Sequence, residues 1–332
     1  QSSTPVIVVI DDYEGRVASL AALQRLRAAL PAADIRVLCA QPLDAAATES
    51  LRDVEYLVLI RERTRITEAL LDRLPSLKAL VQTGTAGQPA TSHIDLAACA
   101  RRGIAVLEGG ASDRHSAAEG AWALILASRR QLCGYVQSMQ RGEWQRGNNA
   151  PALARSLRGD TFGILGFGRI GQLLGSYATA FGMNVLVWGS ENSRAAAREH
   201  GVQFAASRAA LFADSDVLTL QLRLNAATRY SVTLQELSLM KPTALLVNTA
   251  RPALLAPGAL EAALKAGRPG SAAIDVHDME PVLAATELTR LPNCLATPHI
   301  GYVEAQSYEI MFAAAFQVLE AHLARAGSAR PA

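Results

Sequence analysis

Short apolar runs alternate with amphipathic segments along the first half of the chain. Five runs predict buried strands, and four stretches with apolar residues at helical spacing lie near them. The predicted strands are residues 6–10, 35–38, 56–60, 77–81 and 104–107, and the predicted helices are residues 15–30, 44–51, 67–74 and 95–102. Because strands that alternate with helices usually pair in parallel, this half predicts a parallel sheet with helices on both faces.

The same alternation restarts in the second half. A long helical stretch from residue 116 to about residue 140 leads into a second series of strands, at residues 161–165, 184–187, 217–220, 244–247, 272–276 and 294–296. The last helical segment, residues 307–324, has no strand behind it, so we expect it to return and pack on the first half. The pattern therefore predicts an α/β protein with two doubly wound parallel sheets. Its first domain is discontinuous, residues 1–115 plus 299–332, and residues 116–298 form the inserted domain.

A glycine motif follows the first strand of the second series. The sequence Gly166-Phe167-Gly168-Arg169-Ile170-Gly171 is G-x-G-x-x-G between a strand and a helix. In this context the first glycine permits a tight turn, the second lets the backbone approach a pyrophosphate, and the third lets helix and strand pack closely. The start of the helix also presents free N–H groups to phosphates. The motif predicts a dinucleotide site.

The residues after the next strand bear on the choice of cofactor. An NAD-binding chain usually has Asp or Glu about 20 residues past the glycines, where it bonds the ribose 2′-hydroxyl. Here Gly189 stands at that position, and Ser190 and Arg194 could bind a 2′-phosphate. Glu191 argues the other way, and Arg194 could simply lie on a solvated helix face. We expect NADP in preference to NAD, with NAD left open.

Three segments at predicted strand ends carry candidate chemistry. They contain Arg251, Glu280 and His299. Reduction of a 2-keto acid by hydride needs a cation for the carboxylate, a proton donor for the ketone, and a group that favours the protonated donor. Arg251 could supply the cation, His299 the proton and Glu280 the group that favours the imidazolium of His299. Each also has an ordinary structural alternative, as a surface ion pair, a helix N-terminal charge or a cap.

Four ordered motifs resemble one enzyme family. They are G-F-G-R-I-G, M-K-P-T-A-L-L-V-N-T-A-R, D-V-x-x-x-E-P and P-N-C-L-A-T-P-H-I-G, and the similarity to the D-isomer-specific 2-hydroxyacid dehydrogenases runs from about Val54 to Gln317. The resemblance implies a flavodoxin-like substrate domain, an inserted Rossmann domain and an active site in the cleft between them. It also implies Arg251, Glu280 and His299 as the catalytic trio. The resemblance further implies a loop that binds the substrate carboxylate, with the residues Arg61, Gly84, Thr85, Ala86 and Gly87. It implies contacts with the cofactor from Thr249, Ala250 and Asp275.

The chain departs from the family pattern at several positions. Pro252 replaces the glycine usual after the arginine, which fixes φ and removes an N–H. Gln88–Thr91 are extra residues in the carboxylate loop. Arg223 ends an apolar strand at the expected cofactor edge, where it could meet the nucleotide or solvent. His277 and His115 are rival histidines for the role of acid.

Composition narrows the class of protein further. The 332 residues carry a formal net charge of +2, with no basic block and no membrane-length apolar run. We therefore expect no nucleic acid and no membrane as partners. The four cysteines, Cys39, Cys99, Cys133 and Cys294, are scattered, which fits reduced thiols in a cytoplasmic enzyme. We expect no metal. The continuous apolar character around Trp122 in the long helix predicts a homodimer, as the resemblance implies.

The predicted function is an NAD(P)-dependent reductase of a small 2-keto acid, which also works in reverse as a D-2-hydroxyacid dehydrogenase. A formate- or phosphite-type dehydrogenase of the same fold is an alternative, but Glu280 beside the histidine counts against it. A dinucleotide-sensing protein similar to corepressors of this fold is another. Turnover of a 2-keto acid distinguishes the enzyme from the sensor.

Overall fold

The computed structural model describes residues 4–39, 48–87, 92–145 and 153–328. The chain forms two compact units: unit 1 contains residues 1–113 and 303–332, and unit 2 contains residues 114–302. His299 therefore belongs to unit 2. The extra residues Gln88–Thr91 of the carboxylate loop lie outside the described ranges.

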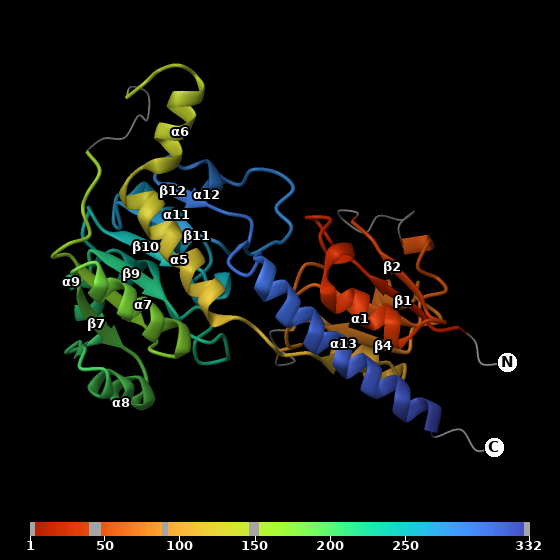
Figure 1. Ribbon diagram of the computed structural model, residues 1–332. Helices are drawn as coiled ribbons and strands as arrows, with labels where there is room; N and C mark the ends of the chain where they lie inside the picture. Colours follow the sequence, from red (N-terminus) through yellow and green to blue (C-terminus); the bar gives the residue numbers. More distant parts are fainter. Residues whose placement is uncertain (1–3, 40–47, 88–91, 146–152, 329–332) are drawn as a thin grey trace. The chain divides into compact units, whose positions relative to one another are not determined.

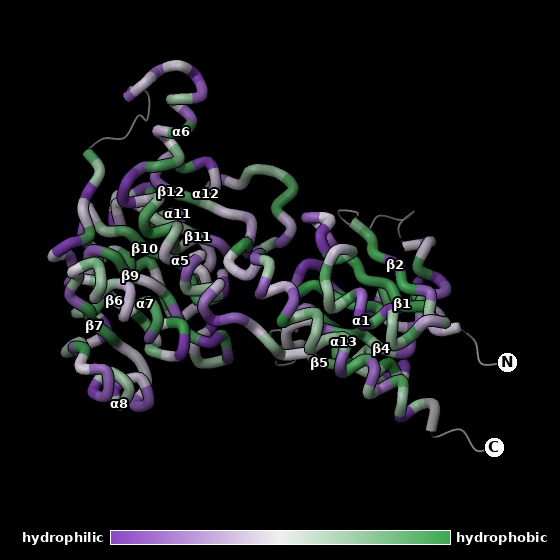
Figure 2. The backbone as a smooth tube through the Cα atoms, in the orientation of Figure 1, coloured by the Kyte–Doolittle hydropathy of each residue, from purple (hydrophilic) through white to green (hydrophobic). Residues whose placement is uncertain are grey.

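Unit 1 is built on a five-stranded parallel sheet in the order β2-β1-β3-β4-β5, the flavodoxin-like order. The strands are β1 (Val6–Val9), β2 (Asp34–Val37), β3 (Tyr56–Leu59), β4 (Ala79–Gln82) and β5 (Ala105–Glu108). Its helices are η1 (Val17–Ser19), α1 (Ala21–Ala29), α3 (Glu68–Leu71), α4 (Leu96–Arg101) and α13 (Ala305–Ser328). The inner strands β1 and β4 are strongly apolar (Figure 2), because both faces of a parallel sheet are covered.

The last helix, α13, packs on α1 and on the strands β4 and β5 (Figure 1). Its Glu309 carboxylate accepts hydrogen bonds from the backbone N–H groups of Ala21 (2.5 Å) and Ala22 (2.9 Å), the first residues of α1. The residue before α1, Leu20, has no side chain that could cap the helix. Since the first N–H groups of a helix lack partners within it, Glu309 supplies the missing acceptor from the far end of the chain.

Unit 2 is built on a seven-stranded parallel sheet in the order β12-β11-β10-β9-β6-β7-β8. The strands are β6 (Thr161–Leu165), β7 (Asn184–Trp188), β8 (Gln203–Phe204), β9 (Val217–Leu220), β10 (Leu245–Asn248), β11 (Ser271–Ile274) and β12 (Cys294–Ala296). The helices are α5 (Arg114–Arg129), α6 (Leu132–Gln140), α7 (Arg169–Ala180), α8 (Glu191–Glu199), α9 (Arg208–Asp214), α10 (Leu234–Leu237), η2 (Pro252–Leu254), α11 (Ala259–Lys265) and α12 (Glu287–Arg290).

Successive residues of the central strands pack into two different apolar clusters. In β10, Leu246 joins one cluster and Leu245 and Val247 join the other. This alternation follows from the two-residue period of a strand, whose side chains point to opposite faces. The sheet is thereby buried on both sides, as its apolar strands predict.

Two sequence expectations for unit 2 are wrong in detail. The helical stretch from residue 116 to about residue 140 is two helices, because Gln131 adopts a left-handed backbone (φ 54°) between α5 and α6. The short edge strand β8 was not expected, because two residues are too few for a recognisable period. None of the helices in the described ranges combines the length and apolar character that a bilayer crossing requires.

Candidate active site

The glycine loop of unit 2 has the geometry of a dinucleotide cradle. A Cβ at Gly166 (φ 94°) would lie 2.8 Å from the carbonyl oxygen of Gln221, and one at Gly171 would lie 2.7 Å from the carbonyl oxygen of Gly166. A Cβ at Gly168 would meet nothing within 4 Å. Two glycines are therefore needed for packing, and the middle one leaves open space where a pyrophosphate would approach the start of α7. The residues present fit the cofactor.

The place of this loop in the sheet supports the same assignment. The preceding strand, β6, is paired with β9 on one side and with β7 on the other, so the strand order reverses there. Ligands of open α/β sheets bind at the carboxyl ends of the strands beside such a switch point.

At the end of β7, a serine occupies the space beside Gly189. A Cβ at Gly189 would lie 2.6 Å from Oγ of Ser193, and that Oγ accepts a hydrogen bond from the backbone N–H of Phe167 (3.2 Å). Ser193 thus ties the first turn of α8 to the glycine loop, which sequence reasoning missed. Nearby, the Arg194 guanidinium lies 4.2 Å from the centroid of the Phe204 ring and 3.5 Å from Glu191. Ser190 caps the same helix through its hydroxyl, which accepts from the N–H of Ser193 (3.4 Å).

Three neighbouring strand ends carry the predicted trio. In the sheet register, Asn248 of β10 lies opposite Ile274 of β11, and Ile274 lies opposite Ala296 of β12. Arg251 follows β10 by three residues, Glu280 follows β11 by six, and His299 follows β12 by three. All three therefore leave the sheet at one edge, from adjacent strands.

Glu280 and His299 are in direct contact. The Nδ1 atom of His299 donates to Oε2 of Glu280 at 2.7 Å, and the other carboxylate oxygen accepts from the backbone N–H of His277 at 2.9 Å. The His299 ring is largely covered and meets Tyr302 edge-to-face, with centroids 5.4 Å apart. With Nδ1 directed at the carboxylate, Nε2 is the ring atom that can exchange a proton with a substrate.

Opposing effects act on the pKa of Glu280. Burial raises it, but the hydrogen bond and charge of His299 and the N–H of His277 outweigh burial and hold the pKa below its usual value. Glu280 therefore stays ionised, as a charged acceptor for the His299 ring.

The rival histidine His277 has a structural role. Its Nε2 lies 2.8 Å from the carbonyl oxygen of Thr297, and because a carbonyl only accepts, Nε2 must donate. The backbone N–H of His299 donates to the same carbonyl (3.0 Å). His277 thus supports the loop that carries His299. The other rival, His115, is an exposed residue of the first turn of α5.

The arginine segment is held by Asn248, which is buried at the end of β10. Its side chain accepts from the N–H of Ala250 (3.1 Å) and donates to the carbonyl oxygen of Arg251 (3.0 Å). The Arg251 guanidinium donates to the carbonyl of Ala250 (2.7 Å). Pro252 is the first residue of the helix η2, a position where the ring fits and no N–H is needed. The unusual proline is therefore compatible with the site.

The predicted substrate loop of unit 1 is partly engaged in internal bonds. The N–H of Gly84 donates to Oε1 of Gln82 (3.2 Å), and the N–H of Ala86 donates to the Glu108 carboxylate. These two N–H groups therefore already have acceptors within unit 1. A Cβ at Gly84 would lie 3.4 Å from Nη1 of Arg61, so this guanidinium does lie against the loop.

Other expected residues lie at strand ends of unit 2. Arg223 is exposed three residues after β9, in a turn where its carbonyl accepts from the Thr228 hydroxyl (2.6 Å). Asp275 follows β11 directly and is buried. Within the described ranges, no group of three or more His, Cys, Asp or Glu side chains could hold a metal ion.

Comparison with known proteins identifies the class. Residues 122–301 match the family model described as the NAD-binding domain of D-isomer-specific 2-hydroxyacid dehydrogenases. The chain belongs to this family, whose members are NAD-dependent oxidoreductases acting on 2-hydroxy or 2-keto acids.

Individual relatives cover most of the chain. A glyoxylate reductase of Thermococcus litoralis is 33% identical over 79% of this chain and 78% of its own length. A D-3-phosphoglycerate dehydrogenase of Methanocaldococcus jannaschii is also 33% identical. The matched region covers 76% of this chain but only 47% of that protein. The crystal structure of a phosphoglycerate oxidoreductase from Vibrio cholerae superposes with a TM-score of 0.89 at 45% identity, over 98% of this chain and 100% of that one.

The glycine geometry makes a prediction about the cradle. Gly168→Ala should leave the melting temperature of the protein almost unchanged, because the new methyl group meets open space, while dinucleotide affinity falls. Gly171→Ala should instead lower the melting temperature, because its methyl group would collide with the Gly166 carbonyl. Thermal unfolding and cofactor titration of the two variants check this. A Gly168→Ala protein with parental cofactor affinity would contradict the assignment of this glycine loop to pyrophosphate binding.

Proposed function

We propose that this protein reduces a small 2-keto acid to its D-2-hydroxy acid with NADPH or NADH, and catalyses the reverse reaction, with His299 as general acid and base. The observation that carries the proposal is the 2.7 Å contact between His299 Nδ1 and the ionised Glu280 carboxylate. A carboxylate-supported imidazole is the group that can protonate a ketone oxygen near neutral pH.

The chemistry divides among the residues as follows. The dinucleotide, when bound, supplies the hydride to the ketone carbon. His299 gives its Nε2 proton to the ketone oxygen as the carbon–oxygen double bond becomes single, and it takes that proton back in the reverse direction. Arg251 pairs with the substrate carboxylate through its planar guanidinium. Glu280 remains ionised throughout and stabilises the protonated histidine.

Binding residues follow from the cradle and the strand ends. For the cofactor we assign Gly166, Phe167, Gly168, Arg169, Ile170, Gly171, Gly189, Ser190, Arg194, Thr249, Ala250 and Asp275. For the substrate we assign Arg61 and the loop of Gly84, Thr85, Ala86 and Gly87. Since the N–H groups of Gly84 and Ala86 already donate within unit 1, those of Thr85 and Gly87 are the proposed donors to the carboxylate.

The cysteines Cys39, Cys99, Cys133 and Cys294 are free thiols, which is typical of a reducing compartment, and we place the enzyme in the cytoplasm.

We also propose a preference for NADP over NAD. Gly189 places no carboxylate at the end of β7, and the nearby Glu191 carboxylate in the first turn of α8 is paired with Arg194 at 3.5 Å. The first turn of α8 offers backbone N–H groups to an anion, and Arg194 adds a guanidinium held over the Phe204 ring.

The oligomer proposed is a homodimer built through α5 and α6. Three apolar side chains at helical spacing on α6, Leu132, Val136 and Met139, are each between 48% and 59% exposed. Figure 1 shows α6 projecting from the rest of unit 2. An exposed apolar row of this kind marks a protein contact.

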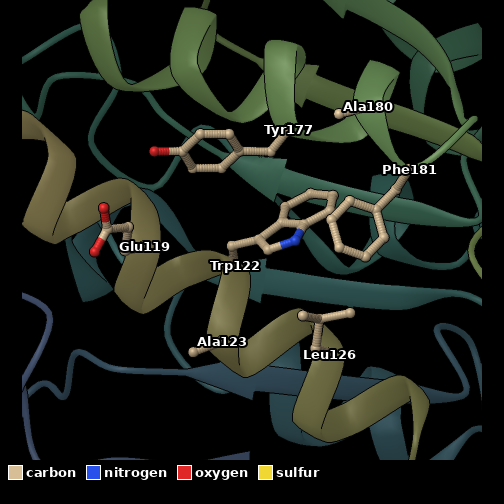
Figure 3. A pocket seen from close by; sticks show the side chains of 7 residues that line it. All are labelled: Glu119, Trp122, Ala123, Leu126, Tyr177, Ala180 and Phe181. Atoms are coloured by element: carbon tan, nitrogen blue, oxygen red, sulfur yellow. The ribbon is translucent and has the colours of Figure 1, made fainter.

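A groove between α5 and α7 fits the same interface. It is lined by Trp122, Leu126, Tyr177 and Phe181, and the indole lies edge-on to both other aromatic rings (Figure 3). The α6 row and this groove offer complementary apolar surfaces to a second copy of the chain.

The proton donor assignment predicts a loss of rate. His299→Ala should lower kcat for 2-keto acid reduction by roughly 10²–10⁴-fold, since a positioned general acid contributes that much. Arg251→Lys should raise KM and lower kcat, because the two-pronged grip on a carboxylate is lost. Cofactor oxidation followed at 340 nm with glyoxylate, pyruvate, hydroxypyruvate and bulkier 2-keto acids measures both.

In the same assay, kcat/KM falls as the pH rises, and for Glu280→Gln this fall should begin at a lower pH than in the parent. Activity on the acid side should be retained. The sign follows because the ionised Glu280 favours the imidazolium, and an amide does not. Glu287→Gln, an exposed glutamate in α12, is the matched control and should leave the profile unchanged. A cofactor-binding protein that turns over no 2-keto acid, or a His299→Ala variant with parental kcat, would overturn the proposed function.

The cofactor preference has its own test. The Cβ of Gly189→Asp would collide with Ser193, so the new carboxylate must be introduced together with Ser193→Gly. Relative to Ser193→Gly alone, the double variant should shift the ratio of kcat/KM values towards NADH by roughly 1–3 kcal/mol, the scale of a hydrogen bond to a charged group. An unchanged ratio of the kcat/KM values for the two cofactors would contradict the role given to Gly189.

The interface predicts association at micromolar concentration. Light scattering should give the mass of a dimer for the parent. Val136→Asp with Met139→Asp should give a folded monomer, because two charges then replace the apolar row. Leu239→Asp, at an exposed apolar position elsewhere on unit 2, should remain dimeric. A parental monomer would exclude the dimer.

A further inference from the structure

The loop that carries His299 has a backbone conformation that needs support. His299 adopts φ 54°, in the left-handed region that residues with a side chain seldom occupy. Such a conformation persists where the surroundings hold it on both sides. The groups that hold it therefore decide where the imidazole lies.

The carboxylate of Asp275 holds this loop on both sides of the histidine. It accepts from the Thr297 hydroxyl (2.5 Å), two residues before His299, and from the backbone N–H groups of Ile300 (2.8 Å) and Gly301 (2.7 Å), the two residues after it. Asp275 is 2% exposed. Three donors converge on one buried anion, and charge-assisted bonds of this kind are short and strong.

The far end of the loop is fixed by close packing. A Cβ at Gly301 would lie 3.1 Å from Oδ2 of Asp275, and a Cβ at Gly120 of α5 would lie 3.1 Å from Cα of Gly301. From the same helix, the Ser116 hydroxyl donates to the Gly301 carbonyl oxygen (3.0 Å). Glycine at both positions lets the loop lie close to Asp275 and to α5.

We propose that Asp275 is a positioning residue that sets the rate through the backbone of His299, beyond any contact it makes with the dinucleotide. The inference rests on the proposed function, in which His299 moves the proton. With the loop bonded to Asp275, Nδ1 of His299 lies at 2.7 Å from Glu280 and Nε2 has a defined place. Without the Asp275 carboxylate, the Thr297 hydroxyl and the N–H groups of Ile300 and Gly301 lose their acceptor. The loop around His299 then shifts, and the imidazole is displaced.

The test is a double-mutant cycle. Asp275→Asn keeps the shape of the side chain but turns one acceptor into a donor, which cannot accept an N–H of the loop. In the parent background, kcat should fall by about 10–100-fold, the size expected from a misplaced catalytic group. In the His299→Ala background the same change should alter the residual kcat by less than about twofold, since the group being positioned is absent. The rates are measured at saturating dinucleotide, with the Kd of each variant taken from fluorescence titration, so that a lost cofactor contact of Asp275 is separated from the loss of kcat.

Two outcomes would overturn the inference. One is an equal loss of kcat in both backgrounds, which makes the effect independent of His299. The other is an unchanged kcat, with or without a raised dinucleotide Kd. Asp278→Asn is the matched control, an exposed aspartate three residues further on, and should have parental kcat in both backgrounds.

A milder variant covers the case in which Asp275→Asn does not fold. Thr297→Val removes one donor to Asp275 at nearly constant volume, and its smaller loss of kcat should likewise vanish in the His299→Ala background; additive losses would overturn the inference. The proposed function is tested separately, because parental kcat in the single variant His299→Ala would contradict it.

Discussion

The parallel register of three strands is the constraint on which the site depends. Because β10, β11 and β12 pair in register, with Asn248, Ile274 and Ala296 opposite one another, the segments that follow them leave the sheet at a single edge. The apolar clusters on both faces of the sheet keep that register, since a slip by one residue would turn every buried side chain to the wrong face. Residues far apart in sequence are thereby held within reach of one another.

On that scaffold, the polar groups that follow the strands hold one another in a continuous network. Glu280 accepts from the backbone of His277 and from the ring of His299, while His277 supports Thr297 through its own ring. Burial would favour a neutral Glu280, but these donors keep it ionised and hold its pKa low. A half-buried carboxylate with these bonds is a fixed source of negative charge beside the His299 ring.

Much of this arrangement could be predicted from the sequence. Apart from the two-residue strand β8, the strands and the glycine loop were predictable because their signals are local. Apolar runs mark buried strands, and the spacing of Gly166, Gly168 and Gly171 follows from one turn and one helix start. The break at Gln131 was not, because glutamine carries no preference for a left-handed backbone. Contacts such as Ser193 with Phe167, or Glu108 with Ala86, join a side chain to a backbone more than 20 residues away, and no period in the sequence encodes them.

The central claim is that Nδ1 of His299 is committed to Glu280, so that Nε2 is the nitrogen that exchanges the proton. ¹⁵N NMR of the protein with labelled histidine tests this directly, with the His299 signals assigned by their loss in His299→Ala. At a pH where the imidazole is neutral, the account predicts that Nδ1 carries the hydrogen and Nε2 is bare. A neutral His299 with its hydrogen on Nε2 and a bare Nδ1 would contradict the account.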